Sequence, residues 1–358
     1  MTARLGRYRL VEPIGRGGMG VVWSARLDDG AFVAIKVLTS MRARDARFRQ
    51  SFRREARAIA RLDHPGIVSV HDLGEVAVDE GTEEVPARSP YLVMDLIRGV
   101  SLHHHRGQLG WTRLRSVLIA LLHALAHAHS RGVVHGDLKP SNVLLDEHGV
   151  RLTDFGVARS ADPGGWAPQE LPAGGTPSYM APELLTAGWR DVGPWTDLYG
   201  LGSLAWALAA VRPPFARGHR LETMAAQIND DLPRFVPKHP VPAGFLPWLE
   251  RLLCKRADGR YQRAADAAWS LLSLPETVPG GDPPTDRPTE GAPTSVEVPR
   301  TTVFWTDAEL PQTPAMAPER LPRLAVGRPV AEAPMPSSWR SLPQLGGAAR
   351  RLAGTGLG

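Results

Sequence analysis

Three short apolar runs open the chain, and each is separated from the next by a glycine-rich or Asp-Gly turn. They are YRLVEPIG (8–15), GVVWSARL (20–27) and FVAIKVL (32–38). Runs of this length, rich in Val and Ile and bounded by turn residues, predict an antiparallel meander. Two further strands are expected within 67–78 and 90–97. The amino-terminal third therefore favours an antiparallel sheet with one helix inserted in it.

The inserted helix, around residues 45–62, is rich in arginine. Phe48, Phe52, Ala56 and Ile59 follow one another at helical spacing within it. This pattern predicts a packed helix whose arginines form the solvated face. The net charge of +5 leaves nucleic-acid binding open as an alternative. A basic run without a further motif is weak support for that partner, so we favour the packed helix.

From about residue 112 the pattern becomes helical. The segment 112–132 begins at Thr112, a candidate N-cap, and ends at Gly132. Further helices are expected near 197–211, 221–230, 244–254 and 263–274. The longest apolar run, 198–211, is shorter than the roughly 20 residues that a membrane helix needs. With no apolar signal segment at the amino terminus and a single cysteine, the sequence predicts a cytoplasmic protein without a membrane partner.

The composition changes after residue 274. Residues 275–358 contain 15 of the 33 prolines and little sustained periodicity. Such a segment is expected to be a linker or a disordered tail. It also predicts that a C-terminal regulatory domain or partner lies beyond it.

The first motif with chemical meaning is a glycine-rich turn. Gly15, Gly17 and Gly20 form the pattern G-x-G-x-x-G. Alone this is a weak signal, because the same pattern opens dinucleotide-binding units. Here it bridges two expected strands and not a strand and a helix. That context favours a hairpin whose backbone N–H groups approach nucleotide phosphates.

The second motif is a lysine on the third strand. The chain has 42 basic residues but only four lysines, and one of them is Lys36 in VAIK. A lysine directed from a strand into a cleft requires a counter-charge. Glu55 on the arginine-rich helix is the expected partner, and the pair would hold the ammonium against nucleotide phosphates.

The third motif is the loop VVHGDLKPSN (133–142). Asp137, Lys139 and Asn142 lie within it, and Asp154 of the sequence DFG follows twelve residues after Asn142. These residue types suit phosphoryl transfer. Asp137 can accept a hydrogen bond from the attacking hydroxyl, while Asn142 and Asp154 can bind Mg²⁺ at the phosphates. Lys139 can neutralise charge on the transferred group.

With these motifs in this order, residues 8–272 resemble the eukaryotic-type protein kinases, close to the bacterial Ser/Thr kinases. The order continues with GTPSYMAPE (175–183), DLYGLG (197–202) and DGR (258–260). A single motif of this kind is a hypothesis, whereas the ordered set is highly specific. The resemblance implies an α+β, bilobal fold with an N-lobe at 8–97 and a C-lobe at 98–274. It also implies ATP with Mg²⁺ or Mn²⁺ as cofactors.

The resemblance further assigns nucleotide contacts. Met94 would be the gatekeeper, with Asp95 and Ile97 offering hinge backbone groups to adenine. The residues implied to enclose the adenine are Ile14, Val22, Ala34 and Leu144.

Structural and substrate roles come from the same resemblance. The side chains implied to stack in the active state are Ile59, His135 and Phe155. Glu183 would pair with Arg260, and Asp197 would brace the catalytic loop. Lys139 together with Thr176 indicates Ser or Thr as the acceptor in a protein substrate.

Gly136 departs from the pattern of the family, which usually has Arg before the catalytic Asp. That Arg pairs with a phosphate on the activation loop. Between Asp154 and Gly175 the only hydroxyl residue is Ser160. Both features predict activity that does not depend on activation-loop phosphorylation. Gly136 is also expected to loosen the backbone beside Asp137 and thereby to lower the rate.

Three alternatives stay open. A pseudokinase that binds nucleotide as a scaffold would be indicated by loss of the Lys, an Asp or the Asn, all of which are present. A small-molecule phosphotransferase would lack the APE segment, which the chain has. A metal site on the histidines is the third alternative, but no HExxH motif accompanies them. These histidines are His103, His104, His105, His123, His127 and His129.

Overall fold

The structure is a computed structural model, and it describes residues 3–17, 20–39, 45–155, 177–186 and 191–278. The chain divides into two units, 1–321 and 322–358, and all described residues belong to the first. Of the predicted linker, 275–358, only residues 275–278 are among the described residues.

A six-stranded antiparallel sheet forms the first half of the described chain. Its strands are β1 (Arg4–Leu5), β2 (Tyr8–Gly17), β3 (Gly20–Arg26), β4 (Phe32–Leu38), β5 (Val70–Glu75) and β6 (Pro90–Asp95). They lie in the order β1-β2-β3-β4-β6-β5. The predicted meander corresponds to β2, β3 and β4, and the two further predicted strands are present. Strand β1 was not predicted, because two residues carry no measurable alternation.

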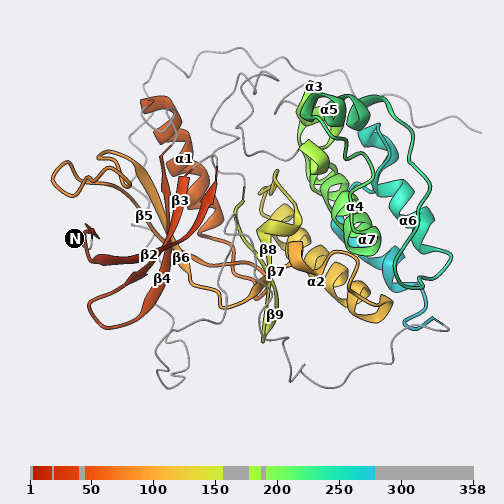
Figure 1. Cartoon of the computed structure of the whole chain (residues 1–358), viewed down its shortest axis with the longest axis horizontal. Helices are drawn as coiled ribbons and strands as arrows, with labels where there is room; N and C mark the ends of the chain where they lie inside the picture. Colours follow the sequence, from red (N-terminus) through yellow and green to blue (C-terminus); the bar gives the residue numbers. More distant parts are fainter. Residues whose placement is uncertain (1–2, 18–19, 40–44, 156–176, 187–190, 279–358) are drawn as a thin grey trace, which may run out of the picture. The chain divides into compact units, whose positions relative to one another are not determined.

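Helix α1 (Ala46–Ile59) is the arginine-rich helix, and Figure 1 shows it beside the sheet. Phe48, Phe52, Ala56 and Ile59 are all buried, as their spacing predicts. They share one hydrophobic core with residues of β4, β5 and β6. The packed helix is thus confirmed, with Arg53, Arg54 and Arg57 exposed to solvent.

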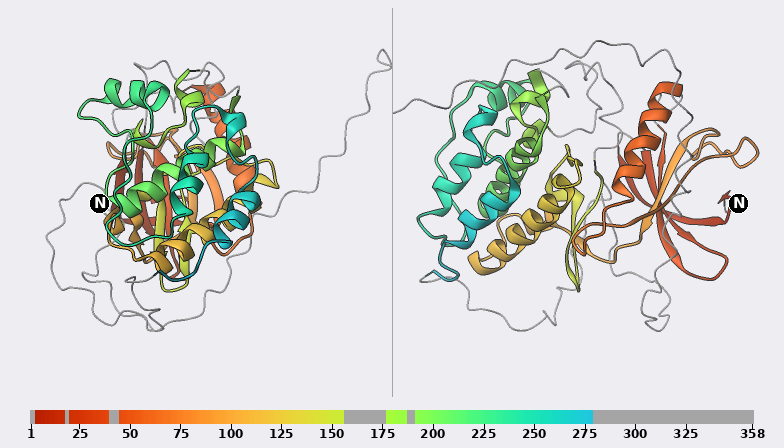
Figure 2. Two further views of the ribbon diagram at one scale, coloured as in Figure 1. Left: turned by 90° about the vertical axis from the view of Figure 1, so that its right-hand side faces the viewer. Right: turned by 180° about the vertical axis from the view of Figure 1, so that it is seen from behind.

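A second, three-stranded sheet lies between the first sheet and the helices. It consists of β7 (Val100–Ser101), β8 (Val143–Asp146) and β9 (Gly149–Leu152). The helices of this half are α2 (Trp111–His129), α3 (Pro182–Thr186), α4 (Pro194–Ala210), α5 (Arg220–Asn229), α6 (Phe245–Leu252) and α7 (Ala264–Leu272). Figure 2 shows these helices on the side of the small sheet away from the six-stranded sheet. An α+β chain with two lobes is therefore confirmed.

Helix α4 is the centre of the helical lobe. It contains most of the longest apolar run of the sequence, and nearly every residue from Thr196 to Ala209 is buried. A helix that is apolar on all sides must be enclosed by protein or by lipid. Here α2 and α6 pack against it in a shared core. No helix in the described part of the chain has both the length and the apolar character needed to cross a bilayer.

One prediction at the end of an element is wrong. Helix α2 starts at Trp111 with Gly110 as its N-cap, so Thr112 lies inside the first turn. The Thr112 hydroxyl instead donates to the carbonyl oxygen of Glu276 at 3.3 Å. Residues 275–278, which the composition assigns to the linker, are described and adjoin α2 through this contact. Trp111 Nε1 donates to the Pro275 carbonyl oxygen at 2.7 Å. Proline content alone could not reveal these backbone acceptors.

Candidate active site

A largely apolar pocket of about 340 Å³ opens where the six-stranded sheet meets the helical lobe. Its walls contain eight of the residues predicted to contact nucleotide or metal: Ile14, Val22, Ala34, Met94, Asp95, Ile97, Leu144 and Asp154. Three further wall residues, Val68, Leu96 and Thr153, were not predicted. The Thr153 hydroxyl donates to the Met94 sulfur at 3.9 Å, so these two wall residues contact each other.

The glycine-rich turn joins β2 to β3, as the sequence predicts. Gly17 and Gly20 are partners in the antiparallel register of these two strands. Residues 18–19 lie outside the described residues. Gly20 also has a packing reason to be glycine, because a Cβ there would overlap the carbonyl oxygen of Val37 on β4. Gly15, Gly17 and Gly20 do not line the pocket itself.

In this structure Lys36 pairs with Asp154 and not with Glu55, the partner that the sequence predicts for it beside nucleotide phosphates. Lys36 Nζ lies 2.7 Å from Asp154 Oδ1, and the two side chains are 20% and 19% exposed. Charges this close and this far removed from water attract strongly. Glu55 accepts a hydrogen bond from Ser51 Oγ, one turn earlier in α1, at 3.1 Å. Lys36 therefore neutralises the Asp of DFG, and not the carboxylate on the helix.

Asp154 reaches the pocket through an unusual backbone conformation. Its φ is 59°, in the left-handed region that non-glycine residues seldom occupy. The strand β9 ends at Leu152, and Thr153 N–H donates to the carbonyl oxygen of Asn142 at 3.0 Å. The end of β9, immediately before Asp154, is thereby tied to the loop that contains Asn142.

The residues of the HGDLKPSN loop converge on one carboxylate. Lys139 Nζ lies 2.8 Å from Asp137 Oδ2. Asn142 Nδ2 donates to the backbone oxygen of Asp137 at 2.8 Å and contacts Oδ2 at 3.3 Å. Because its amide nitrogen is used in this way, the Asn142 side-chain oxygen is the atom available to a cation. The predicted trio of Asp137, Lys139 and Asn142 is thus brought together.

His135 fixes the backbone beside this carboxylate. The ring is fully buried, and burial lowers its pKa. Its Nε2 lies 2.9 Å from the Thr153 carbonyl oxygen, and its Nδ1 accepts from the Asp137 N–H at 3.2 Å. A neutral imidazole protonated on Nε2 satisfies both contacts. The ring also lies against Phe155 in a tilted arrangement, with 4.7 Å between the ring centroids, and Ile59 and Phe155 belong to one hydrophobic core.

Asp197 at the start of α4 supports the loop from behind. Its carboxylate accepts the backbone N–H groups of His135 at 2.8 Å and of Gly136 at 2.7 Å. His129 Nε2 at the end of α2 lies 2.7 Å from the same carboxylate. Gly136 has a φ of 71°, which glycine adopts without the penalty that a side chain incurs. The expected loosening by Gly136 is therefore opposed by a backbone that Asp197 holds in place.

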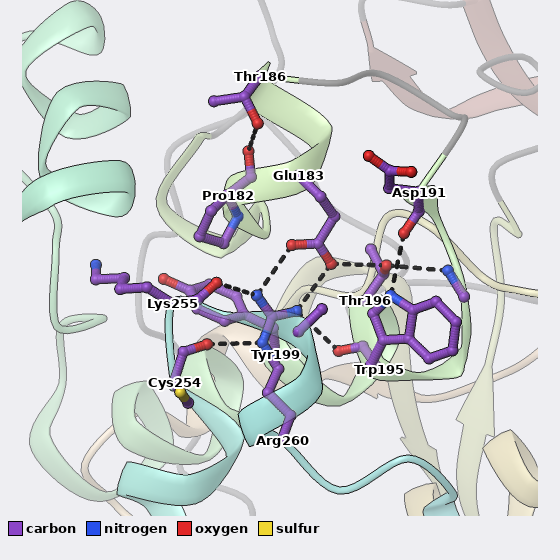
Figure 3. A network of polar contacts seen from close by, with 12 residues as sticks. Pro182, Glu183, Thr186, Asp191, Trp195, Thr196, Tyr199, Cys254, Lys255 and Arg260 are labelled. Atoms are coloured by element: carbon purple, nitrogen blue, oxygen red, sulfur yellow. Dashed lines mark hydrogen bonds and ion pairs between the residues drawn. The ribbon is translucent and has the colours of Figure 1, made fainter.

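Figure 3 shows the buried ion pair between Glu183 and Arg260. The guanidinium of Arg260 is fully buried and bonds both carboxylate oxygens of Glu183, at 2.8 and 2.9 Å. It also donates to the carbonyl oxygens of Cys254 and Lys255 and lies over the ring of Tyr199. The predicted contact is present, and it ties α3, which begins at Pro182 within the GTPSYMAPE motif, to the segment before α7. Thr176 and Ser160 lie outside the described residues.

The histidines do not form a metal centre in the described part of the chain. There, no three His, Cys, Asp or Glu side chains are grouped so as to hold a metal ion. The rings of His64 and His127 are tilted against each other with 5.1 Å between their centroids, and burial is the main cause that lowers the pKa of each.

Comparison with known proteins gives this geometry a context. Residues 8–263 match the model of the protein kinase domain. The chain is 37% identical to the serine/threonine-protein kinase PknA of Mycobacterium tuberculosis over 278 residues, which cover 75% of this chain and 61% of PknA. It is 41% identical to PkaA of Streptomyces coelicolor, also named a serine/threonine-protein kinase, over 71% of this chain and 47% of PkaA. The match thus covers less than two thirds of either relative.

Solved structures of protein kinase domains have the same fold. The crystal structure of the PknI kinase domain of Mycobacterium tuberculosis aligns with a TM-score of 0.59 at 29% identity, covering 76% of this chain and 97% of that domain. The six-stranded sheet, the helical lobe and the pocket between them correspond to the protein kinase fold. On its sequence match and its fold, the chain belongs to the protein kinase domain family.

Proposed function

We propose that the chain is a serine/threonine protein kinase that transfers the γ-phosphate of ATP to Ser or Thr hydroxyls of a protein. The observation that best supports this function is the convergence of Lys139 and Asn142 on Asp137, beside a pocket that contains the Lys36–Asp154 pair. Positioning and charge neutralisation are the main demands of phosphoryl transfer. The relatives PknA and PkaA carry the same activity in their names.

Each residue has a role in the proposed reaction. Asp137 accepts the hydrogen bond of the incoming hydroxyl, and Lys139 stabilises negative charge on the transferred group. Lys36 contacts the phosphates, and Glu55 is its proposed partner when nucleotide is bound. Asn142 and Asp154 provide oxygen atoms of the kind that Mg²⁺ or Mn²⁺ prefers. The metal ion, when bound, offsets the charge of the phosphate oxygens.

The apolar pocket walls fit an adenine ring, with Ile14, Val22, Ala34 and Leu144 on its faces. Met94, Asp95 and Ile97 lie at the end of β6 and in the segment that follows, where they would offer backbone groups and limit the depth of the site. Gly15, Gly17 and Gly20 would approach the phosphates. Thr176 is the proposed contact for the residue after the acceptor, and Lys139 supports Ser or Thr over Tyr.

We also propose that activity does not require a phosphate on the activation segment. Gly136 has no side chain that could bind such a phosphate, and Ser160 is the only hydroxyl residue between Asp154 and Gly175. Protein treated with phosphatase is expected to keep its activity. The proposal is wrong if that treatment removes most of the activity and autophosphorylation within 157–180 restores it.

We propose in addition that the kinase activity is regulated by a domain or partner on the C-terminal side of the fold. Residues 275–278 adjoin α2, where Trp111 Nε1 donates to the Pro275 carbonyl oxygen at 2.7 Å. A regulatory domain or partner that follows this segment would act from there. A cytoplasmic location stays part of the proposal.

The test of the function is transfer of radiolabelled γ-phosphate from Mg-ATP to a generic protein substrate by the purified chain. Asp137→Asn is expected to abolish transfer, whereas Asp28→Asn, on the exposed β3–β4 turn, is the matched control. Transfer by Asp137→Asn at the native rate would contradict the proposal.

A further inference from the structure

A bulge in strand β5 lies directly opposite the end of the strand that forms the pocket wall. In the antiparallel register of β5 and β6, Val70 pairs with Met94 and Asp72 pairs with Val93. His71 is thus the extra residue between two consecutive partners. Bulges of this kind redirect a side chain and are often found next to active sites.

The bulge directs His71 towards the hinge. Its Nε2 lies 2.6 Å from Asp95 Oδ1, and the imidazole is only 14% exposed. The other carboxylate oxygen of Asp95 accepts the Ser69 N–H at 3.1 Å. Both oxygens of the carboxylate are therefore held by the chain that enters β5. The neighbouring Asp72 contacts a different set of residues, since its carboxylate accepts a hydrogen bond from Tyr8 Oη at 2.8 Å.

The electrostatics agree with this geometry. Burial alone would raise the pKa of the Asp95 carboxyl. Hydrogen bonds and charge from His71, together with bonds from Ser69, outweigh burial and lower that pKa. The carboxylate is therefore ionised in the folded protein near neutral pH, and its hydrogen bond to the imidazole has a charged acceptor.

Asp95 is also part of the pocket wall, followed there by Leu96 and Ile97. The Asp95 N–H donates to the Ser69 carbonyl oxygen at 3.1 Å, so the backbone and the side chain of Asp95 share one support. The same support reaches β9, because Val68 N–H donates to the Leu152 carbonyl oxygen at 2.9 Å. Residues 66–71 therefore join the hinge to the strand that precedes Asp154.

We propose that His71 is a positioning residue for nucleotide binding: by holding the Asp95 carboxylate, it fixes the hinge backbone at which adenine is recognised. The inference rests on the proposed function, since it assumes that the pocket binds adenine nucleotide. His71 itself does not line the pocket, so its effect passes through Asp95.

Adenosine is the suitable probe, because it lacks phosphates and reports on the hinge alone. In His71→Leu, which cannot donate, we expect the adenosine Kd measured by calorimetry to rise about tenfold, the order expected for one hydrogen bond to a charged group. In His71→Gln, which keeps an N–H donor, most of the affinity should return. The KM for ATP should rise in His71→Leu while kcat at saturating ATP stays within about twofold.

The matched control is Asp72→Asn, which disturbs the same strand through Tyr8 without touching the hinge. It should lower the melting temperature and leave the adenosine Kd unchanged. If His71→Leu lowers the melting temperature but binds adenosine like the native protein, the residue is merely structural and the inference is overturned. Equal weakening of adenosine binding in Asp72→Asn would overturn it as well.

A measurement on the unmodified protein covers the case in which His71→Leu does not fold. Saturation with adenosine should shift the ¹⁵N signals of the His71 ring, and unchanged signals would overturn the inference. Failure of the proposed function looks different, because a chain that binds adenosine but transfers no phosphate leaves these results standing.

Discussion

The carboxylate of Asp197 accepts the backbone N–H of Gly136 at 2.7 Å and holds that residue at a φ of 71°. One helix side chain thus fixes the residue directly before Asp137 in a conformation that suits glycine. Glycine in place of the arginine of the family pattern therefore has two effects at this position. Gly136 removes a phosphate-binding side chain and, at the same position, removes backbone strain from the loop.

Replacing Gly136 should therefore lower the free energy of unfolding, by more for residues that are more strained at a positive φ. Gly136→Arg is expected to lower the free energy of unfolding by about 1–2 kcal/mol, because a left-handed backbone is unfavourable for residues with a Cβ. Gly136→Asn should cost less, since asparagine tolerates this region. Urea unfolding of both variants measures the difference. Equal stability of the Arg variant and the native protein would show that the loop is not held at positive φ.

The Glu183–Arg260 pair gives a second prediction. Arg260→Met should lower the free energy of unfolding by about 3–5 kcal/mol, because it leaves the Glu183 carboxylate buried without its counter-charge. The control is Arg256→Ala, which removes an exposed arginine of the same segment that pairs with Asp258. Chemical denaturation should detect no change in the control. Similar losses in both variants would contradict the account.

Val211, directly after α4, has a positive φ like Gly136, but unlike glycine it carries a side chain that makes this conformation strained. It is β-branched, yet its φ is 74°. Glycine adopts a positive φ without the steric penalty that a side chain incurs. Val211→Gly should raise the free energy of unfolding by about 1 kcal/mol, the release of backbone strain being partly offset by the entropy of glycine. Thermal melts would reveal a higher Tm, and a lower Tm would show that the apolar contacts of Val211 matter more.

Lys255 makes stability depend on pH. Burial is the main cause that lowers the pKa of its ammonium to about 8, with Asp230 and Asp231 acting in the other direction. Between about pH 8 and the ordinary 10.5, the unfolded chain holds a proton that the folded chain has lost. The contribution of this group to stability therefore rises with pH across that window. The unfolding free energy of the native protein minus that of Lys255→Met should therefore increase from pH 8 to 10.5. A difference that stays constant over this range would exclude the effect.

The resemblance to the protein kinases, carried by local motifs, predicted most of the pocket. It assigned Val22, Ala34 and Leu144 to the adenine site, and the pocket contains all three. Val68 and Thr153 belong to no motif. They reach the pocket through a bridge between Ile67 and Leu152, two segments 85 residues apart. A pairing of that kind depends on tertiary packing, which no window of sequence records.

The partner of Lys36 could not be predicted for a related reason. Glu55 and Asp154 are both acidic, and the choice between them depends on how far the helix lies from the strand. The structure places Asp154 at 2.7 Å, aided by its positive φ, whereas Glu55 accepts from Ser51. His71 went unnoticed because a bulge leaves no trace in the alternation of a short strand.

The most direct measurement is phosphate transfer and nucleotide affinity in the same Asp137→Asn protein. The account predicts that transfer from Mg-ATP to a Ser/Thr substrate falls by at least about a hundredfold, since the carboxylate that orients the hydroxyl is lost. The Kd for ATP should stay within about threefold, because Asp137 does not line the pocket. A native chain that binds ATP but transfers no phosphate to Ser or Thr, with the same result in Asp137→Asn, would contradict the central claim.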